Sequence, residues 1–328
     1  MLRWGVLSTA NIGIEQVIPA LQIANNGNVV AIASRDLARA KSVASLFGIP
    51  DAYGSYEELL SSDQIDAVYI PLLTSQHVEW SIKAADAGKH VLCEKPIALH
   101  ASEIDAIIDA RERNKVLITE AFMVTYHPQW HKVRALLAEG AIGELKHVQA
   151  AFTYNNTDPK NMRNILAYGG GALPDIGVYP TVGTRFVTGM EPRRVSAQVQ
   201  RNTTTGTDNY ASWRADFGDF DMTTYVSTEM ALRQEIAFHG DQGWMELTAP
   251  FNAGLYDADT VILHNKDHDE VQTFRFAGIN QYQLQAEAIG RALAGEKEEI
   301  FSLESSRNNQ KLIDAIYKAG ASGSWEDV

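Results

Sequence analysis

The sequence GKHVLCEKP at residues 88–96 places a lysine where it could act on a ligand. Its apolar part, His90–Cys93, has the length and flanking residues of a buried strand. Glu94 and Lys95 follow at the carboxyl end of that strand, and ligands of open α/β sheets bind outside the carboxyl ends of strands. Lys95 therefore either faces a ligand or is an ordinary solvated lysine before a turn proline.

A second stretch supplies a carboxylate and a phenol. Residues 169–179 begin with three glycines and then follow a helical pattern. Asp175 and Tyr179 are four residues apart, so they would share one face of that helix. Turned toward Lys95, this face would present both groups to the amine; otherwise it is a capped helix with a half-buried tyrosine. A free phenol titrates near ~10, and a neighbouring ammonium group stabilises its ionised form.

The elements that must position Lys95 alternate between strand and helix as far as residue 121, which predicts a parallel sheet. Six strands fit the doubly wound dinucleotide fold, with strand order 3-2-1-4-5-6. In that order the first, fourth and fifth strands are neighbours. The loops at residues 8–13, 71–77 and 94–96 would then line one crevice, although they are far apart in sequence.

The loop after the first strand occupies the place of a G-x-G-x-x-G fingerprint. Its fingerprint positions hold Ser8, Ala10 and Gly13, so only the third glycine is present. Small residues still allow the backbone to approach a pyrophosphate at a helix N-terminus. We expect this loop to contact a dinucleotide through Ser8, Thr9, Ala10, Asn11 and Ile12.

The second strand ends in Ser34-Arg35-Asp36. An acidic residue directly at this strand end would bind the ribose 2′-hydroxyl of NAD, whereas an arginine beside a hydroxyl group suits the 2′-phosphate of NADP. Alternatively, Arg35 lies along the surface while Asp36 caps the next helix. The sequence favours NADP(H), with NAD(H) possible.

The loop after the fourth strand is expected to add Pro71, Leu72, Thr74 and His77 to the crevice. Thr74 or Ser75 could cap the helix that follows, which would place His77 in its first turn. A single histidine is more often structural than chemical, so a structural role is the first expectation.

After residue 121, short runs alternate between apolar and polar residues and are separated by turns, which predicts a mostly antiparallel sheet. We therefore expect an α/β Rossmann domain at residues 1–121 and an α+β domain with a large open sheet at residues 122–328. The catalytic cleft is expected between the two domains. His264–Glu270 mixes histidine with acidic residues, but a solvated hairpin turn is the favoured interpretation, and no metal site is predicted.

The composition excludes several partners. The chain has 28 basic and 41 acidic residues, a formal net charge of −13, which argues against nucleic acid and anionic membranes. Cys93 is the only cysteine, so no intrachain disulfide is possible, and a cytoplasmic location is expected. No signal peptide is visible, and no apolar run approaches the ~20 residues of a membrane span.

Three motifs, WGVLSTANIG, GKHVLCEKP and GGGALPDIGVYP, together resemble the glucose-fructose oxidoreductase/inositol dehydrogenase/MocA (Gfo/Idh/MocA) family. The resemblance extends to EAFMVTYHPQW at residues 120–130 and DPKNMRN at residues 158–164. Within the family the chain is most similar to NADP-dependent xylose 1-dehydrogenase and trans-dihydrodiol dehydrogenase. These carry a tyrosine at the position of Tyr179, where inositol dehydrogenases carry a histidine.

The resemblance implies an enzyme that transfers a hydride between nicotinamide and a CH–OH group of a sugar, sugar-like polyol or dihydrodiol. In that reaction Lys95 would bind the substrate oxygen, Tyr179 would give and take the proton, and Asp175 would orient the substrate or its partner residues. Arg163 and Tyr126 would line the substrate side.

The resemblance also assigns roles near the cofactor. Glu94 would fix the cofactor or Lys95, and His77 would lie near the nicotinamide ribose. Two positions depart from the family pattern. Thr74 stands where the family usually has asparagine, and Thr125 stands where close relatives often have arginine or another large residue.

Two other functions occur on this scaffold. One is a non-catalytic dinucleotide-binding regulator or scaffold, whose sequences tend to lose the lysine or its partner; Lys95, Asp175 and Tyr179 are all retained here. The other is NAD-dependent glycoside cleavage. The family resemblance further implies a homodimer or homotetramer formed through the exposed face of the second sheet.

Overall fold

The computed structural model describes residues 1–328, which separate into two compact units. The first unit contains residues 1–123 and 280–307, and the second contains residues 124–279 and 308–328. The change of unit at Met123 lies close to the expected boundary at residue 121. The return of residues 280–307 to the first unit was not anticipated, because no local signal in the sequence distinguishes that helix from the elements before it.

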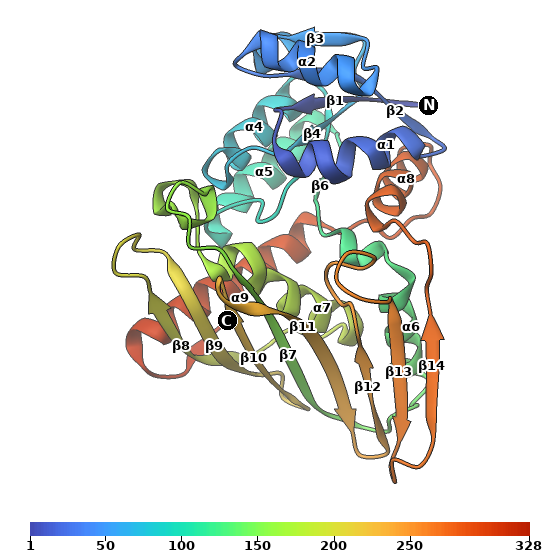
Figure 1. Cartoon of the computed structure of the whole chain (residues 1–328), viewed down its shortest axis with the longest axis vertical. Coiled ribbons are helices and arrows are strands. Elements are labelled where there is room, and N and C mark those ends of the chain that lie inside the picture. The colour runs from blue at the N-terminus through green and yellow to red at the C-terminus, as the bar shows by residue number, and fades with distance from the viewer. The chain divides into compact units, whose positions relative to one another are not determined.

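The first unit contains a parallel six-stranded sheet with the strand order β3-β2-β1-β4-β5-β6, as predicted (Figure 1). Every neighbouring pair in this sheet is parallel. Its strands are β1 (Leu2–Leu7), β2 (Gly27–Ala33), β3 (Asp51–Tyr53), β4 (Ala67–Ile70), β5 (His90–Cys93) and β6 (Ile118–Glu120).

Both faces of this sheet are buried, since alternate side chains of each central strand enter different cores. Val68 and Ile70 of β4 belong to the core that helices α3, α4 and α5 complete. Ala67 and Tyr69 of the same strand face the core of α1, α2 and α8. The helices are α1 (Ile18–Ile23), preceded by the π-helical turn η1 (Gly13–Val17), α2 (Leu37–Phe47), α3 (Tyr56–Leu60), α4 (Thr74–Asp86), α5 (Ala101–Asn114) and α8 (Gln281–Leu293).

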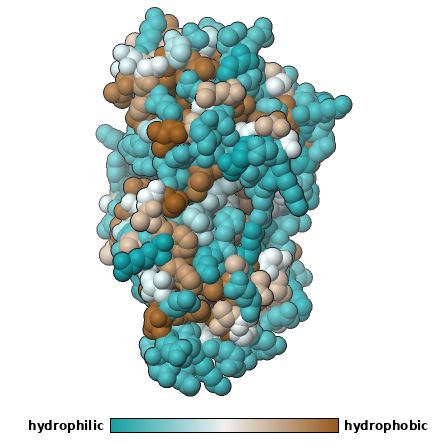
Figure 2. Space-filling model, turned by 90° about the vertical axis from the view of Figure 1, so that its right-hand side faces the viewer, coloured by the Kyte–Doolittle hydropathy of each residue, from teal (hydrophilic) through white to brown (hydrophobic).

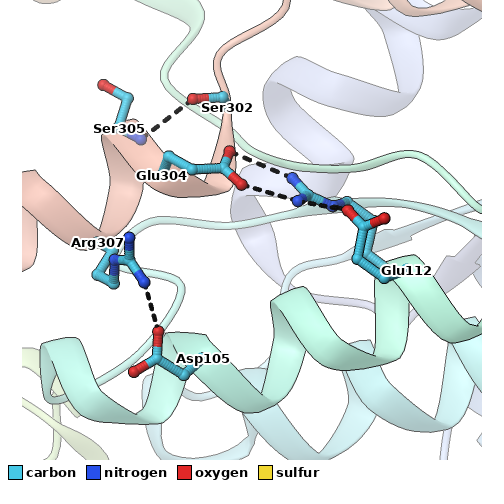
Figure 3. Close-up of polar contacts among 7 residues, drawn as sticks. Asp105, Glu112, Ser302, Glu304, Ser305 and Arg307 are labelled. Carbon is cyan, nitrogen blue, oxygen red and sulfur yellow. Dashed lines mark hydrogen bonds and ion pairs between the residues drawn. The ribbon is translucent and has the colours of Figure 1, made fainter.

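The returning segment is tied to the first unit by polar contacts. The guanidinium group of Arg307 donates a 2.7 Å hydrogen bond to the carboxylate of Asp105 on α5 (Figure 3). The carboxylate of Glu304 accepts two hydrogen bonds from Arg111. On α8, the carbonyl of Glu287 accepts a hydrogen bond from the side chain of Asn26. Exposed ion pairs contribute little stability, so the apolar side chains of α8, such as Ile289, account for most of the attachment.

The second unit contains a nine-stranded sheet with the order β14-β13-β12-β11-β7-β10-β9-β8-β15 (Figure 1). All neighbours are antiparallel except the parallel pair β7 and β10. The predicted large, mostly antiparallel sheet is therefore confirmed. Its strands are β7 (Leu145–Asn155), β8 (Arg194–Arg201), β9 (Asp208–Asp216), β10 (Asp221–Ser227), β11 (Glu229–Gly240), β12 (Gly243–Leu247), β13 (Thr260–Asn265), β14 (Val271–Arg275) and β15 (Glu326–Asp327).

Helices cover one face of this sheet. On that face, Phe152 of β7 packs against Tyr179 of α7, and Phe251 stacks on Trp130 of α6. Polar side chains such as Gln149 alternate with these apolar residues along β7 and point to the other face. The helices are α6 (Pro128–Ala138), α7 (Val178–Thr188), preceded by the π-helical turn η5 (Leu173–Gly177), and α9 (Leu303–Ser322).

Several local predictions differ from the structure. Helix α4 begins at Thr74, and its N-cap residue is Leu73, whose side chain cannot accept a capping hydrogen bond. The predicted capping by Thr74 or Ser75 is therefore wrong. The spacing of Leu37 with Ala40, Ala44 and Phe47 predicts that Leu37 faces the core, but it is 40% exposed. Strand β13 was not predicted, and it takes in His264, the first residue of the expected hairpin turn.

The visible surface is largely polar. In Figure 2 hydrophilic residues cover much of the visible surface, and hydrophobic residues form separate patches. None of the helices has the length and apolar character needed to span a membrane.

Candidate active site

Lys95 is the second residue after β5, at the carboxyl end of a strand that lies between β4 and β6 in the parallel sheet. The peptide bond from Lys95 to Pro96 is cis. Its neighbour Glu94 is held by the sheet itself, because Oε1 of Glu94 accepts a 2.7 Å hydrogen bond from the hydroxyl of Tyr69 on β4. Oε2 of Glu94 accepts the backbone N–H of Lys95 at 3.3 Å. Burial raises the pKa of Tyr69, and the Glu94 carboxylate raises it further, so the phenol stays a donor.

Glu120, the last residue of β6, contacts the loop that carries Lys95. It was not predicted as a site residue. Its side chain is 3% exposed, and its Oε1 accepts the backbone N–H of Ile97 at 2.9 Å. Burial raises the pKa of Glu120 to about 7, while the Ile97 N–H and the charge of Lys95 oppose this rise. A buried carboxyl group that titrates near neutrality therefore supports the loop that carries the lysine.

His77 links two loops of the first unit. Its side chain is 1% exposed, with Nδ1 2.8 Å from the Pro96 carbonyl oxygen and Nε2 3.1 Å from the Leu72 carbonyl oxygen. Burial lowers the pKa of His77, although both carbonyl groups favour its protonated form. His77 thus fastens the loop after β4 to the loop after β5, a structural contribution to the shape of this sheet edge.

In the loop after β1, the first fingerprint position has a backbone conformation that glycine adopts more readily than other residues. Ser8 has φ = 139°, a value that residues with a side chain rarely adopt. Two hydrogen bonds hold it there: its hydroxyl donates to the Pro71 carbonyl at 3.1 Å and accepts the Ala10 N–H at 3.2 Å. The first and fourth strand-end loops are therefore joined at the first fingerprint position.

The end of β2 favours a basic rather than an acidic contact with a ligand. The carboxylate of Asp36 is engaged as the N-cap of α2, since its Oδ1 accepts the N–H groups of Ala38 and Arg39. Arg35 is exposed. Burial raises the pKa of Tyr56, and the nearby charge of Arg35 partly opposes this rise. Ser34 accepts the Asp36 N–H with its hydroxyl.

Arg39 is a second basic group in this region, and the sequence reasoning missed it. Its Nη2 donates to the carbonyl oxygen of Thr9 at 3.1 Å, so the guanidinium group lies against the fingerprint loop. Arg39 follows Arg35 by four residues, and the presence of two basic residues shortly after β2 was the signal available in the sequence.

In the second unit, Asp175 collects two donors on one oxygen. The Tyr154 hydroxyl donates to Oδ2 of Asp175 at 2.6 Å, and Nε of Arg163 donates to the same oxygen at 3.0 Å. Burial and the Asp175 charge raise the pKa of Tyr154 well above its ordinary value. The same carboxylate raises the pKa of Arg163. Tyr154 was not among the predicted site residues.

Arg163 reaches Asp175 from a short 3₁₀ turn, Met162–Asn164, whose N-cap is Asn161. Gly170 lies against this turn with no space for a side chain, since a Cβ there would be 2.4 Å from the Arg163 carbonyl oxygen. Gly170 thus allows the Arg163 turn to lie close to the segment that leads into η5.

Tyr179 is the second residue of α7 and is 5% exposed. Its ring packs against Phe152 and Phe251, each with centroids 5.8 Å away. Arg163 interacts electrostatically with Tyr179 as well as with Asp175, so these three predicted residues share one neighbourhood. Asp175 belongs to the π-helical turn η5 rather than to α7 itself, a difference from the single helix that was expected.

The remaining predicted residues separate into the two units. Lys95 and the expected cofactor contacts belong to the first unit, whereas Asp175, Tyr179 and Arg163 belong to the second. Tyr126 is a partly buried residue at the end of a 3₁₀ turn, Met123–Tyr126. No group of three or more histidine, cysteine or acidic residues is arranged to hold a metal ion, and His264 instead stacks on Trp244 with centroids 3.9 Å apart.

Comparison with known proteins matches both halves of the chain to one family. The profile described as "Oxidoreductase family, NAD-binding Rossmann fold" matches residues 2–122, and the profile of the GFO/IDH/MocA C-terminal domain matches residues 130–246.

Individual proteins agree with the profiles. The chain is 42% identical to an uncharacterized oxidoreductase of Rhizobium meliloti, over 100% of this chain and 99% of that protein. It is 35% identical to D-xylose 1-dehydrogenase (NADP(+)) 2 of Haloferax volcanii, over 98% of each. The crystal structure of KijD10, a 3-ketoreductase from Actinomadura kijaniata in complex with NADP and TDP-benzene, superimposes with a TM-score of 0.90 at 29% identity, over 97% of each chain. The chain therefore belongs to the Gfo/Idh/MocA family of oxidoreductases, whose N-terminal domain is an NAD-binding Rossmann fold.

Proposed function

We propose that the chain is an NADP-dependent dehydrogenase or reductase that acts on a CH–OH group of a sugar, sugar-like polyol or dihydrodiol. In this proposal the first unit binds the dinucleotide and the second binds the substrate. The observation that carries it is the placement of Lys95 at the carboxyl end of β5, in a unit whose family binds NAD.

Each proposed catalytic residue has a distinct task. NADP supplies the hydride chemistry at its nicotinamide ring when bound. Lys95 binds the substrate oxygen and stabilises the negative charge that develops there. Tyr179 exchanges the hydroxyl proton, because oxidation of a C–OH group releases a proton that a base must accept at hydrogen-bond distance. Asp175, held by Tyr154 and Arg163, orients the substrate beside Tyr179.

The preference for NADP is supported by the charges after β2. Arg35 and Arg39 provide guanidinium groups suited to a 2′-phosphate, and Ser34 provides a hydroxyl. Asp36, the one acidic residue there, already caps α2, which makes it a poor ligand for the ribose hydroxyl of NAD. The fingerprint loop (residues 8–12), Pro71, Leu72, Thr74, His77 and Glu94 are the other proposed cofactor contacts.

The substrate class is supported by the relatives. The Haloferax enzyme is named as a xylose dehydrogenase using NADP, and the Actinomadura structure is a 3-ketoreductase with a TDP-linked ligand. We expect this chain to act on a free or nucleotide-linked sugar, with Arg163 and Tyr126 on the substrate side.

Absorbance at 340 nm tests the function directly. NADP or NAD is incubated with the enzyme and a panel of aldoses, polyols, dihydrodiols and nucleotide-linked sugars, and the reverse reaction is followed with NADPH and keto sugars. We expect NADP-linked turnover of at least one CH–OH substrate. Glycoside consumption without net NADPH production, or dinucleotide binding without any turnover across the panel, would contradict the proposal.

We also propose that the second unit forms a homodimer or homotetramer through the uncovered face of its sheet. That face has a shallow hollow of about 540 Å³, lined among others by Gln149, Ser212, Arg214 and Tyr225. Its polar and aromatic side chains could pair with those of a second copy. Size-exclusion chromatography with light scattering should give a mass of two or four chains, and a monomer at micromolar concentration would contradict this.

A further inference from the structure

Asp208, the first residue of β9, is a buried carboxylate that the mechanism above does not use. It is 1% exposed, and each of its oxygen atoms has a partner. Oδ2 accepts the backbone N–H of Leu173 at 2.7 Å, and Oδ1 accepts the hydroxyl of Tyr317 at 2.6 Å. The carboxylate therefore connects the start of the turn η5 with the C-terminal helix α9, within the second unit.

The backbone at Gly171 passes very close to this carboxylate. A Cβ atom at Gly171 would lie 2.0 Å from Oδ1 of Asp208, and Gly171 has φ = 145°. Only glycine fits both the space and the backbone conformation. The last of the three glycines thus lets the chain turn directly over Asp208 before η5 begins.

The hydrogen bond to Leu173 has consequences for the residues that follow. The first N–H groups of a helical turn have no partner within the turn, and an acceptor at that point fixes where the turn starts. Leu173 opens η5, Asp175 lies within η5, and Tyr179 lies in the first turn of α7. Glycines leave the chain before the turn free to adopt many conformations. The hydrogen bond from Leu173 to Asp208 therefore fixes where η5 begins, and with it the positions of Asp175 and Tyr179.

Neighbouring groups oppose the effect of burial on Asp208. Burial raises the pKa of Asp208, while the Tyr317 hydroxyl, the Leu173 N–H and the charge of Arg201 oppose this rise. The Arg201 guanidinium group lies 5.4 Å from the centre of the Tyr317 ring, so it packs on the same residue that donates to the carboxylate.

We propose that Asp208 is a positioning residue of the active site, itself oriented by Tyr317, and that it controls turnover by fixing the turn that carries Asp175 and Tyr179. The role rests on the function proposed above for those two residues. Asp208 does not need to touch substrate or cofactor for this role.

The test compares Asp208→Ala, Asp208→Asn and Tyr317→Phe with a matched control, Asp259→Ala. Asp259 is another buried aspartate of the second unit that accepts a backbone N–H, from Gly254 at 2.6 Å. Its other oxygen lies 3.5 Å from Nε2 of His127, so its polar contacts involve neither η5 nor α7. We expect Asp208→Ala to lower kcat about 100-fold, as a displacement of about 1 Å at a reacting group does. The dissociation constant for NADPH, measured by fluorescence, should stay within about twofold of the parent value because the first unit is unchanged.

The conservative variant separates positioning from general destabilisation. Asparagine at position 208 can still accept the Leu173 N–H and can donate to the Tyr317 oxygen, so we expect kcat within about tenfold of the parent. Tyr317→Phe should fall between the two aspartate variants. Asp259→Ala should lower the thermal midpoint without a loss of kcat per folded molecule. A parent-like kcat in Asp208→Ala, or an equal loss in Asp259→Ala, would overturn the inference.

Hydrogen exchange gives a readout that does not depend on activity. Asp208→Ala should speed amide exchange across residues 172–179 at least about tenfold relative to both the parent and Asp259→Ala. Unchanged exchange there would overturn the inference even if the enzyme is active. If Asp208→Ala speeds exchange but the parent protein turns over no substrate, the structural role of Asp208 stands and the proposed function is rejected instead.

Discussion

The hydroxyl group of Tyr154 donates a 2.6 Å hydrogen bond to Oδ2 of Asp175, the same oxygen that accepts from Nε of Arg163. A strand residue and a residue of a short 3₁₀ turn thus fix one carboxylate oxygen from two directions. Tyr154 and Arg163, from two separate elements, thus form one polar cluster with Asp175, which lies four residues before Tyr179.

Tyr154→Phe removes one of these two donors. A hydrogen bond to a charged group contributes about 1.5–3 kcal/mol, so the less restrained Asp175 should lower kcat about tenfold. The Michaelis constant for NADP should change less than about twofold, because Tyr154 belongs to the second unit. Steady-state kinetics measure both values. Tyr225→Phe is the control, since Tyr225 accepts from Arg233 elsewhere on the sheet. Equal effects of the two variants would contradict the role of Tyr154.

Lys95→Ala and Tyr179→Phe should each lower kcat by about 10²–10⁴-fold while NADPH still binds. The reason is that one variant removes the group that stabilises charge on the substrate oxygen and the other removes the group that exchanges its proton. Single-turnover kinetics and a fluorescence titration with NADPH measure the two effects separately. Lys83→Ala is the control, because Lys83 is an exposed lysine of the same unit whose ion pairs are with the exposed carboxylates of Glu79 and Glu57. Turnover near the parent rate in either main variant refutes the assigned role.

Arg39→Ala should raise the Michaelis constant for NADP about 10–100-fold and leave that for NAD within about twofold. The guanidinium group is proposed to bind the 2′-phosphate, which NAD lacks, and a charge-assisted hydrogen bond contributes about 1.5–3 kcal/mol. Arg35→Ala should act in the same direction. Parallel kinetics with the two cofactors measure the ratio. An equal loss with NADP and NAD would show instead that Arg39 supports the fingerprint loop through the Thr9 carbonyl.

Glu120→Gln should change how stability depends on pH. Burial raises the pKa of Glu120 from 4.5 to about 7, so the folded state binds more protons than the unfolded state between these values. The parent protein is therefore expected to lose stability as pH rises through this window, because ionisation of the buried carboxyl is unfavourable. Glutamine keeps the acceptor for the Ile97 N–H but does not titrate.

Unfolding experiments at pH 5 and pH 8 measure this difference. The free energy of unfolding of Glu120→Gln minus that of the parent should increase by about 2–3 kcal/mol from the lower to the higher pH. Glu57→Gln, at an exposed carboxylate of the same unit, is the matched control. A difference that stays constant between the two pH values would mean that Glu120 does not carry the perturbed titration.

Local signals in the sequence determined much of the fold and part of the candidate site. The length and flanks of His90–Cys93 identified β5, and hence the position of Lys95 at its carboxyl end. The side chain of Asp36 was identified as a helix cap, which the structure confirms. These features depend on a few neighbouring residues, whose periodicity and turn chemistry are visible without knowledge of the rest of the chain.

Only the tertiary structure decided which distant groups meet. Tyr317 and Asp208 are 109 residues apart, and no local pattern pairs them. The same holds for Arg39 with Thr9 and for α8 with the core of the first unit. Such contacts arise because whole elements must bury their apolar faces, and packing then selects the polar partners. The sequence could therefore name Lys95, Asp175 and Tyr179, but the groups that hold Asp175 and the start of its turn required the folded chain.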